Sequence, residues 1–161
     1  MNKFLLALVF LAMLYNCKSS APSSILSPKT DKVAQATLSG TWQITNILYP
    51  GSQFIEVTSF QIADSKCLIG STWNFISNNN KGTITLNRSD CEAFSTRIVW
   101  SIDKAGNFGF KLVDTGVKSK SVTQGFLLKM ANQSENSFQL IDRINVGGQF
   151  KDITYQFGKV N

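Results

Sequence analysis

The sequence predicts an all-β protein whose strands form an eight-stranded antiparallel up-and-down β-barrel. Apolar periodicity of helical length is scarce, whereas turn-forming residues recur at the spacing of short strands. An open sheet of sequential strands would leave two edges unpaired, and closing it on itself removes both. The predicted strands are Gly40–Leu48, Ser71–Ser77, Thr83–Arg88, Ser95–Ile102, Asn107–Val113, Ser121–Lys129, Ser137–Ile144 and Phe150–Val160.

Residues 1–16 are predicted to be a signal peptide. Lys3 is followed by an apolar run from Phe4 to Leu14, which is too short to span a bilayer. Cys17 comes next, and the stretch resembles the lipobox of bacterial lipoproteins, with Leu14 three residues before the cysteine. Asn16 departs from that pattern, in which a small residue precedes the cysteine. We expect Cys17 to be lipidated and to anchor the protein in the cell envelope, on the outer membrane facing the periplasm. The alternative is an ordinary signal peptide with an incidental cysteine.

Residues 17–37 are predicted to be a lipidated cysteine followed by a flexible tether, because the segment is rich in serine and proline. Its last part, Asp31 to Leu38, is expected to form a short helical turn at one end of the domain. Residues 38–161 are predicted to be the barrel domain. We expect a monomer.

Cys67 and Cys91 remain once the predicted anchor is set aside. An even pair of cysteines in an exported protein indicates a disulfide, since the periplasm is oxidising. A reactive thiol would need a neighbour such as histidine to stabilise the thiolate, and the sequence has no histidine. We therefore expect both cysteines to be structural.

Strict alternation along the strands places the large apolar residues on one face and the polar ones on the other. Asn46, Gln124, Asp142 and Tyr155 are polar exceptions on the apolar, inward face. The long connection from residue 49 to residue 70 is too apolar for a free loop. It is expected to fold over one barrel mouth or to add an irregular strand, and its apolar residues are Phe54, Ile55, Val57, Phe60 and Ile62.

The tripeptide Gly40-Thr41-Trp42 is similar to the G-x-W signature that opens the first strand of the lipocalins. Cys67, the run from Gly70 to Phe75 and the ending KVN are similar to a family of bacterial lipocalin-like lipoproteins. The resemblance implies that Gly40 and Trp42 form the barrel floor. A second lipocalin signature, T-D-Y, is absent, and residues 132–136 stand in its place. A third is a basic residue that covers the tryptophan, for which Lys159 and Arg143 are the candidates.

The composition argues against an enzyme. The absence of histidine excludes a Ser/His/Asp triad, a Cys/His dyad and histidine-ligated zinc or haem. The ten carboxylates are spread along the chain without a pair suited to acid–base work. The net charge of +6 comes from scattered cations and not from a basic run, which argues against nucleic-acid binding. We expect no cofactor and no metal.

A small hydrophobic, lipid-like molecule in the barrel cavity is the predicted ligand, because apolar pockets with a few polar groups are typical of small-molecule sites. The alternative is that the aromatic residues simply fill the barrel and that the polar ones satisfy each other or the backbone. The predicted ligand-binding residues are Trp73, Phe75, Trp100, Phe110, Gln124, Phe126, Asp142 and Tyr155.

Two classes of function follow. The first is a membrane-anchored carrier of a small hydrophobic molecule in the manner of the lipocalins. The second is a periplasmic protein-binding module with a filled barrel, such as a hydrolase inhibitor or an envelope-assembly accessory. A continuous interior cavity of several hundred Å³ favours the carrier, by the usual size of ligand pockets.

Overall fold

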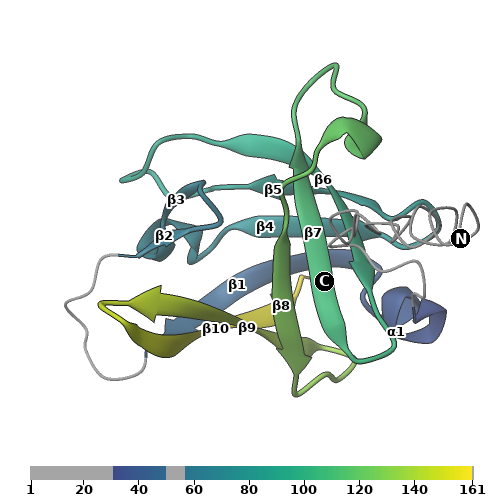
Figure 1. Ribbon diagram of the computed structural model, residues 1–161. Coiled ribbons are helices and arrows are strands. Elements are labelled where there is room, and N and C mark those ends of the chain that lie inside the picture. Colours follow the sequence, from purple (N-terminus) through teal and green to yellow (C-terminus); the bar gives the residue numbers. More distant parts are fainter. Residues whose placement is uncertain (1–30, 50–56, 161) are drawn as a thin grey trace, which may run out of the picture.

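The computed structural model describes residues 31–49 and 57–160, so the predicted signal peptide and Cys17 lie outside the described residues. Eight antiparallel strands close into a barrel in the order β1-β10-β9-β8-β7-β6-β5-β4 (Figure 1). Trp42 in β1 stands opposite Trp73 in β4 and opposite Lys159 in β10, which closes the ring. The predicted up-and-down barrel is confirmed. Its strands are β1 (Gly40–Leu48), β4 (Thr72–Ile76), β5 (Lys81–Thr85), β6 (Ser95–Ile102), β7 (Asn107–Val113), β8 (Phe126–Ala131), β9 (Ser137–Val146) and β10 (Gln149–Lys159).

A short helix, α1 (Lys32–Thr37), lies at one end of the barrel, here called the floor. Asp31 caps it, because its carboxylate accepts hydrogen bonds from the amides of Val33 and Ala34 at 3.1 Å each. The amide of Asp31 donates to the carbonyl of Ile102 at 2.8 Å, which ties the start of the helix to the floor end of β6. The predicted helical turn is therefore confirmed.

The opposite end, here called the mouth, is covered by part of the long connection between β1 and β4. Two short strands, β2 (Thr58–Ser59) and β3 (Ala63–Asp64), form a hairpin that belongs to a separate two-stranded sheet. The 3-10 helix η1 (Ser65–Leu68) follows. The expectation that this connection folds over the mouth is confirmed, although Phe54 and Ile55 lie outside the described residues.

Three predictions about strand detail are wrong. The strand predicted over Thr83–Arg88 begins earlier and ends earlier, at Lys81–Thr85. The register of β1 against β10 shifts between Ile44 and Asn46, so a β-bulge turns Asn46 outward and buries Ile47 in its place. The predicted strand from Ser121 begins only at Phe126. Residues before it form the 3-10 helix η2 (Ser119–Ser121) and a connection held by the Lys111 ammonium, which donates to the carbonyl of Val122 at 2.8 Å.

The disulfide between Cys67 and Cys91 is present and joins η1 to the loop that follows β5. Both ends of the bond lie at the mouth, because η1 leads into β4 there and β5 ends there. Among the described residues, no helix has the length and apolar character needed to cross a membrane.

Candidate functional site

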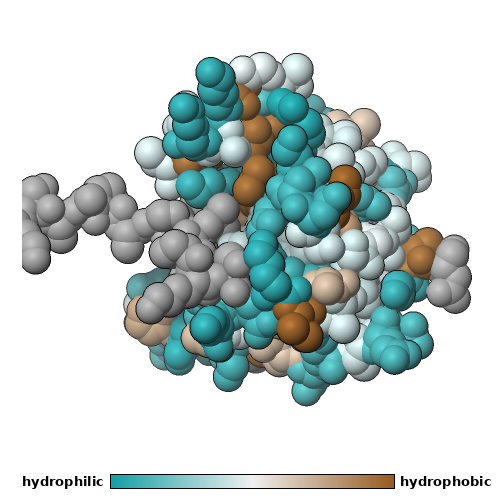
Figure 2. All heavy atoms as spheres, turned by 90° about the vertical axis from the view of Figure 1, so that its right-hand side faces the viewer, coloured by the Kyte–Doolittle hydropathy of each residue, from teal (hydrophilic) through white to brown (hydrophobic). Residues whose placement is uncertain are grey.

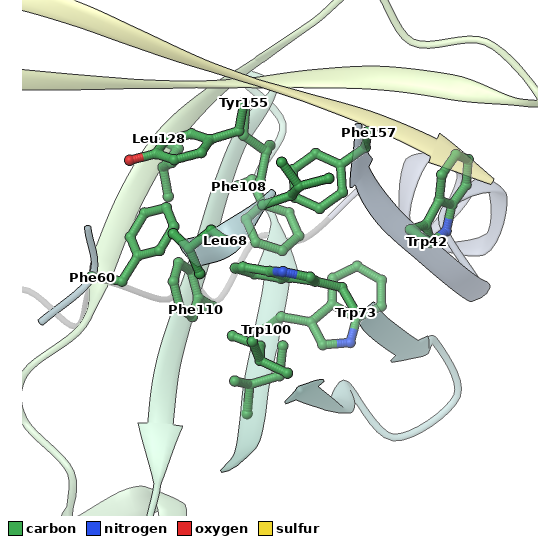
Figure 3. Close-up of a cluster of buried hydrophobic side chains, with 14 of the residues drawn as sticks. Trp42, Phe60, Leu68, Trp73, Trp100, Phe108, Phe110, Leu128, Tyr155 and Phe157 are labelled. Atoms are coloured by element: carbon green, nitrogen blue, oxygen red, sulfur yellow. The ribbon is translucent and has the colours of Figure 1, made fainter. Parts of the chain in front are cut away.

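The barrel interior is packed with aromatic rings (Figure 3). Most of the predicted ligand-binding aromatic residues are fully or almost fully buried there, and they contact one another. Trp73 lies 5.6 Å from Phe110 between ring centroids, and Phe75 lies 5.0 Å from Trp100. The buried members of the predicted set are Trp73, Phe75, Trp100, Phe110 and Tyr155, and Phe126 is half-buried at the edge of the cluster.

Phe60 enters this cluster from the β2–β3 hairpin. Its ring is 3% exposed and lies among rings from four barrel strands, as Figure 3 shows for three of them. The centroid distances are 4.9 Å to Tyr155, 5.2 Å to Phe110, 5.5 Å to Phe126 and 5.9 Å to Trp73. Phe60 therefore fills the space between four residues that the sequence assigns to ligand binding.

The backbone around Phe60 is strained. Phe60 has φ of 55° and Gln61 has φ of 57°, both in the left-handed region. For residues other than glycine this region costs of order 1–3 kcal/mol, more so for a bulky side chain. Burial of the Phe60 ring among aromatic side chains offsets that cost.

Polar side chains lie near the Phe60 ring at the mouth end of the interior. The Ser59 and Tyr155 hydroxyls are buried and lie 2.6 Å apart, within hydrogen-bond distance. Burial raises the pKa of the Tyr155 hydroxyl, and the nearby Asp142 carboxylate adds to that effect. Burial also raises the pKa of the half-buried Asp142. The mouth end of the interior thus holds three polar side chains in an otherwise apolar cluster.

Gln124 is not part of the interior, contrary to the prediction. It is exposed and precedes β8, because the strand begins at Phe126. Asn46 is likewise exposed, because of the bulge in β1. Asp142 and Tyr155 are therefore the two predicted polar residues that the structure brings to the mouth end of the interior.

The floor is built around Trp42, which is fully buried. Its indole nitrogen donates to the carbonyl of Leu38 at 2.9 Å, and its ring meets Phe138 edge-on at 4.8 Å. The Lys159 ammonium lies 5.7 Å from the centroid of the Trp42 ring. Of the two candidates for the basic residue that covers this tryptophan, Lys159 is thus the one in place, whereas Arg143 lies over Phe150.

The described residues also form cavities of ligand size outside the packed interior. One, of about 440 Å³, is at the rim of the mouth beside Gln61, Phe94 and Asp114. Another, of about 550 Å³, lies on the outer wall under the connection that contains η2. Within the part of the chain that the structure describes, no three metal-ligating side chains gather in one place.

No protein-family model and no curated protein sequence matches the chain. Several solved structures resemble it. A lipocalin-like protein from Bacteroides uniformis is 18% identical, with 77% of this chain and 99% of that chain covered and a TM-score of 0.48. An uncharacterized protein from Bacteroides eggerthii is 14% identical over 76% and 98% of the two chains, with a TM-score of 0.46. Bovine odorant-binding protein in complex with undecanal is 12% identical over 84% and 77%, with a TM-score of 0.44.

Two features of the site do not follow from sequence alternation alone. Phe60 lies in a connection, where no strand pattern assigns it to a face, although the high apolar content of that connection does indicate burial. The outer-wall cavity depends on how the 114–125 connection folds back on the barrel, whereas the alternating pattern at the end of this connection predicts a strand.

Proposed function

We propose that the protein binds a small hydrophobic molecule at the mouth end of the barrel, in the space that Phe60 occupies. The observation that carries this proposal is the insertion of one ring, on a strained backbone, between Tyr155, Phe110, Phe126 and Trp73. An incoming apolar ligand would replace the contacts of Phe60 and release the strain. The protein is then a binding protein and not an enzyme.

The hairpin is suited to such an exchange because its β-strands pair with each other and not with the barrel. Its ladder consists of the pairs Thr58–Asp64 and Ser59–Ala63. Segments with few backbone hydrogen bonds to the rest of a fold open at lower free energy than core strands. The disulfide of Cys67 holds η1 in place, so movement is confined to the hairpin that precedes it.

The polar groups beside Phe60 would determine the orientation of the proposed ligand. Once the hairpin moves, Tyr155 loses Ser59 as its hydrogen-bond partner, and a ligand with one polar atom would satisfy the phenol. We therefore expect a mostly apolar ligand with a hydroxyl, carbonyl or amine at one end.

Titration with phenylnaphthylamine, a neutral fluorophore, tests the proposal. The wild-type protein should take up the probe saturably, with a change in tryptophan emission, because Trp73 lines the vacated space. Phe60→Trp should weaken uptake at least tenfold by overfilling the mouth. Phe150→Ala, at a side chain that is 66% exposed, is the control and should leave uptake unchanged. A wild-type protein without saturable uptake would rule the proposal out.

A protein-binding module is the second candidate, and the packed interior favours it. If the rings of Figure 3 are a permanent core, the exposed loops carry the function and small probes find no site. A wild-type protein that binds no probe, and that loses stability on Phe60→Ala without gaining uptake of large probes, would fit this candidate.

Membrane anchoring through Cys17 completes the proposal. The apolar run that ends just before this cysteine supports it, together with the similarity to a lipobox. Two or three acyl chains would hold the protein on a membrane at about 0.8 kcal/mol per buried CH₂. Cys17→Ser should release the protein from the membrane fraction of its host, and unchanged sedimentation with membranes would contradict the anchor.

A further inference from the structure

A basic and apolar groove runs along the outer wall of the barrel, and it shares Thr83, Arg97 and Val113 with the cavity at the rim of the mouth. Strand register aligns Ile76 of β4, Lys81 of β5 and Val99 of β6 in one row across the sheet. These residues point outward, because their neighbours along each strand face the core. The row alternates apolar and cationic side chains.

A second row lies next to the first. Thr83, Arg97 and Val113 stand opposite one another in β5, β6 and β7. Val113 is 6% exposed although it is on the outer face of the barrel, so something outside the sheet covers it. The cover is the connection after β7, which contains η2.

This connection is held down at two points. The Arg97 guanidinium donates to the carbonyl of Asp114 at 2.9 Å, and the Lys111 ammonium donates to the carbonyl of Val122 at 2.8 Å. Between these points the chain stands off the wall and leaves the cavity of about 550 Å³. That volume is within the range of small-molecule sites.

The groove combines exposed apolar side chains with unbalanced positive charge. Ile76 and Val117 are 43% and 41% exposed, which is high for large apolar residues. No aspartate or glutamate lines the groove. Among the residues that the structure describes, none of its cations has a carboxylate within ion-pair distance. The cations are Lys81, Arg97, Lys118 and Lys120.

Figure 2 views this side of the molecule. A stripe of hydrophobic atoms, bordered by hydrophilic atoms on both sides, lies near the top, at the height where Figure 1 places η2. A ligand that matches the stripe and its border needs an apolar chain with an anionic end.

We propose that this groove binds an anionic amphiphile, a molecule with one alkyl chain and a carboxylate or phosphate head. The chain lies along Ile76, Val99 and Val117, and the head lies between the lysines of η2 and its flank, Lys118 and Lys120. Charge pairing and apolar burial act together, so neither a neutral alcohol nor a small free anion meets both requirements. The site is separate from the Phe60 space and does not depend on the function proposed above.

Calorimetric titration of the chain from Lys18 onward, which contains the whole described barrel, tests the proposal. Dodecanoate and dodecyl phosphate are added below their micelle-forming concentrations, and saturable binding of one molecule is expected. Dodecanol should bind at least tenfold more weakly, and inorganic phosphate should not bind saturably. The affinity for dodecanoate should fall with added salt, since the head is partly exposed.

Two pairs of substitutions locate the site. Lys118→Gln with Lys120→Gln should weaken dodecanoate binding at least tenfold. Lys104→Gln with Lys129→Gln removes the same charge at exposed positions outside the groove and should leave the affinity for dodecanoate within twofold of the wild-type value. Equal effects of the two pairs on dodecanoate binding would contradict the proposed binding site. Binding only to vesicles that contain anionic phospholipids would contradict it as well. Phe60→Trp should leave dodecanoate binding intact, which separates this proposal from the mouth site.

Discussion

The hydroxyls of Ser59 and Tyr155 lie 2.6 Å apart across the mouth of the barrel and are both buried. This hydrogen bond links the β2–β3 hairpin to β10. Tyr155→Phe should lower the free energy of unfolding by about 1–3 kcal/mol, because the buried Ser59 hydroxyl loses its partner. Urea denaturation measures the change. In combination with Ser59→Ala the loss should be clearly smaller than the sum, and additive effects would contradict the link.

Trp42→Ala should lower the free energy of unfolding by about 3–5 kcal/mol, the range for removal of a large aromatic residue from a core. Thermal and urea denaturation measure it. Lys159→Gln removes only the cation above the ring and should cost about 0.5–1 kcal/mol, since Lys159 is exposed. Uptake of phenylnaphthylamine at the mouth should be unaffected by Lys159→Gln. A cost of Trp42→Ala no larger than that of Lys159→Gln would show that the tryptophan does not close the floor.

The disulfide should stabilise the protein by roughly 3 kcal/mol, because it closes a loop between residues separated by 24 positions. The variant with both Cys67→Ala and Cys91→Ala should unfold at correspondingly lower urea concentration. Mass spectrometry of a non-reduced digest should find the two cysteines in one linked peptide pair. Two thiols that alkylate without reduction would contradict the bond.

Asp142→Asn should stabilise the protein at neutral pH. Burial raises the pKa of the folded-state carboxyl above the ordinary value of 3.8, so the folded state binds the proton more tightly than the unfolded state. The contribution of Asp142 to the free energy of unfolding is therefore most favourable at low pH and is lost as the pH rises through the unfolded-state and then the folded-state pKa of this carboxyl. The variant should gain little near pH 3 and more near pH 7. Glu135→Gln, at an exposed position, is the control. A gain that does not depend on pH would contradict the explanation.

Gln35→Met should raise the free energy of unfolding by about 1 kcal/mol. The side-chain amide of Gln35 is fully buried in α1 and has no hydrogen-bond partner among the described residues. Gln43→Met is the matched control and should lower the free energy of unfolding, because it removes the hydrogen bond that the Gln43 amide donates to the carbonyl of Gly70 at 3.0 Å. Chemical denaturation of both variants measures the contrast, and a loss of stability in Gln35→Met would refute the prediction.

Alternation of apolar and polar residues was sufficient to predict the barrel and most of its interior. The strand Ser95–Ile102 has its predicted bounds, and Ile98 and Trp100 face inward as expected. Such a pattern cannot reveal an inserted residue. The bulge near Asn46 leaves the composition of β1 unchanged but reverses the face of every residue that follows.

Connections were less predictable than strands, for a related reason. Val122 and Gln124 continue an alternating pattern into β8, yet the carbonyl of Val122 bonds to the Lys111 side chain instead of a strand. No local sequence pattern predicts that Lys111 and Val122 are in contact. Phe60 is similar, because its burial depends on ring contacts with four strands that are remote in sequence. Both the candidate site and the groove therefore depend on tertiary contacts.

The first and last described residues of the barrel domain lie at the same end of the barrel, the floor. Asp31 is bonded to the floor end of β6, and Lys159 stands beside Trp42, so the described chain enters and leaves at one end. Phe60 and the Cys67–Cys91 bond lie at the other. The residues that precede Asp31 therefore join the described barrel at the end remote from Phe60. A ligand or partner of the Phe60 hairpin would thus meet the barrel at the end opposite to the one where the described chain starts and stops.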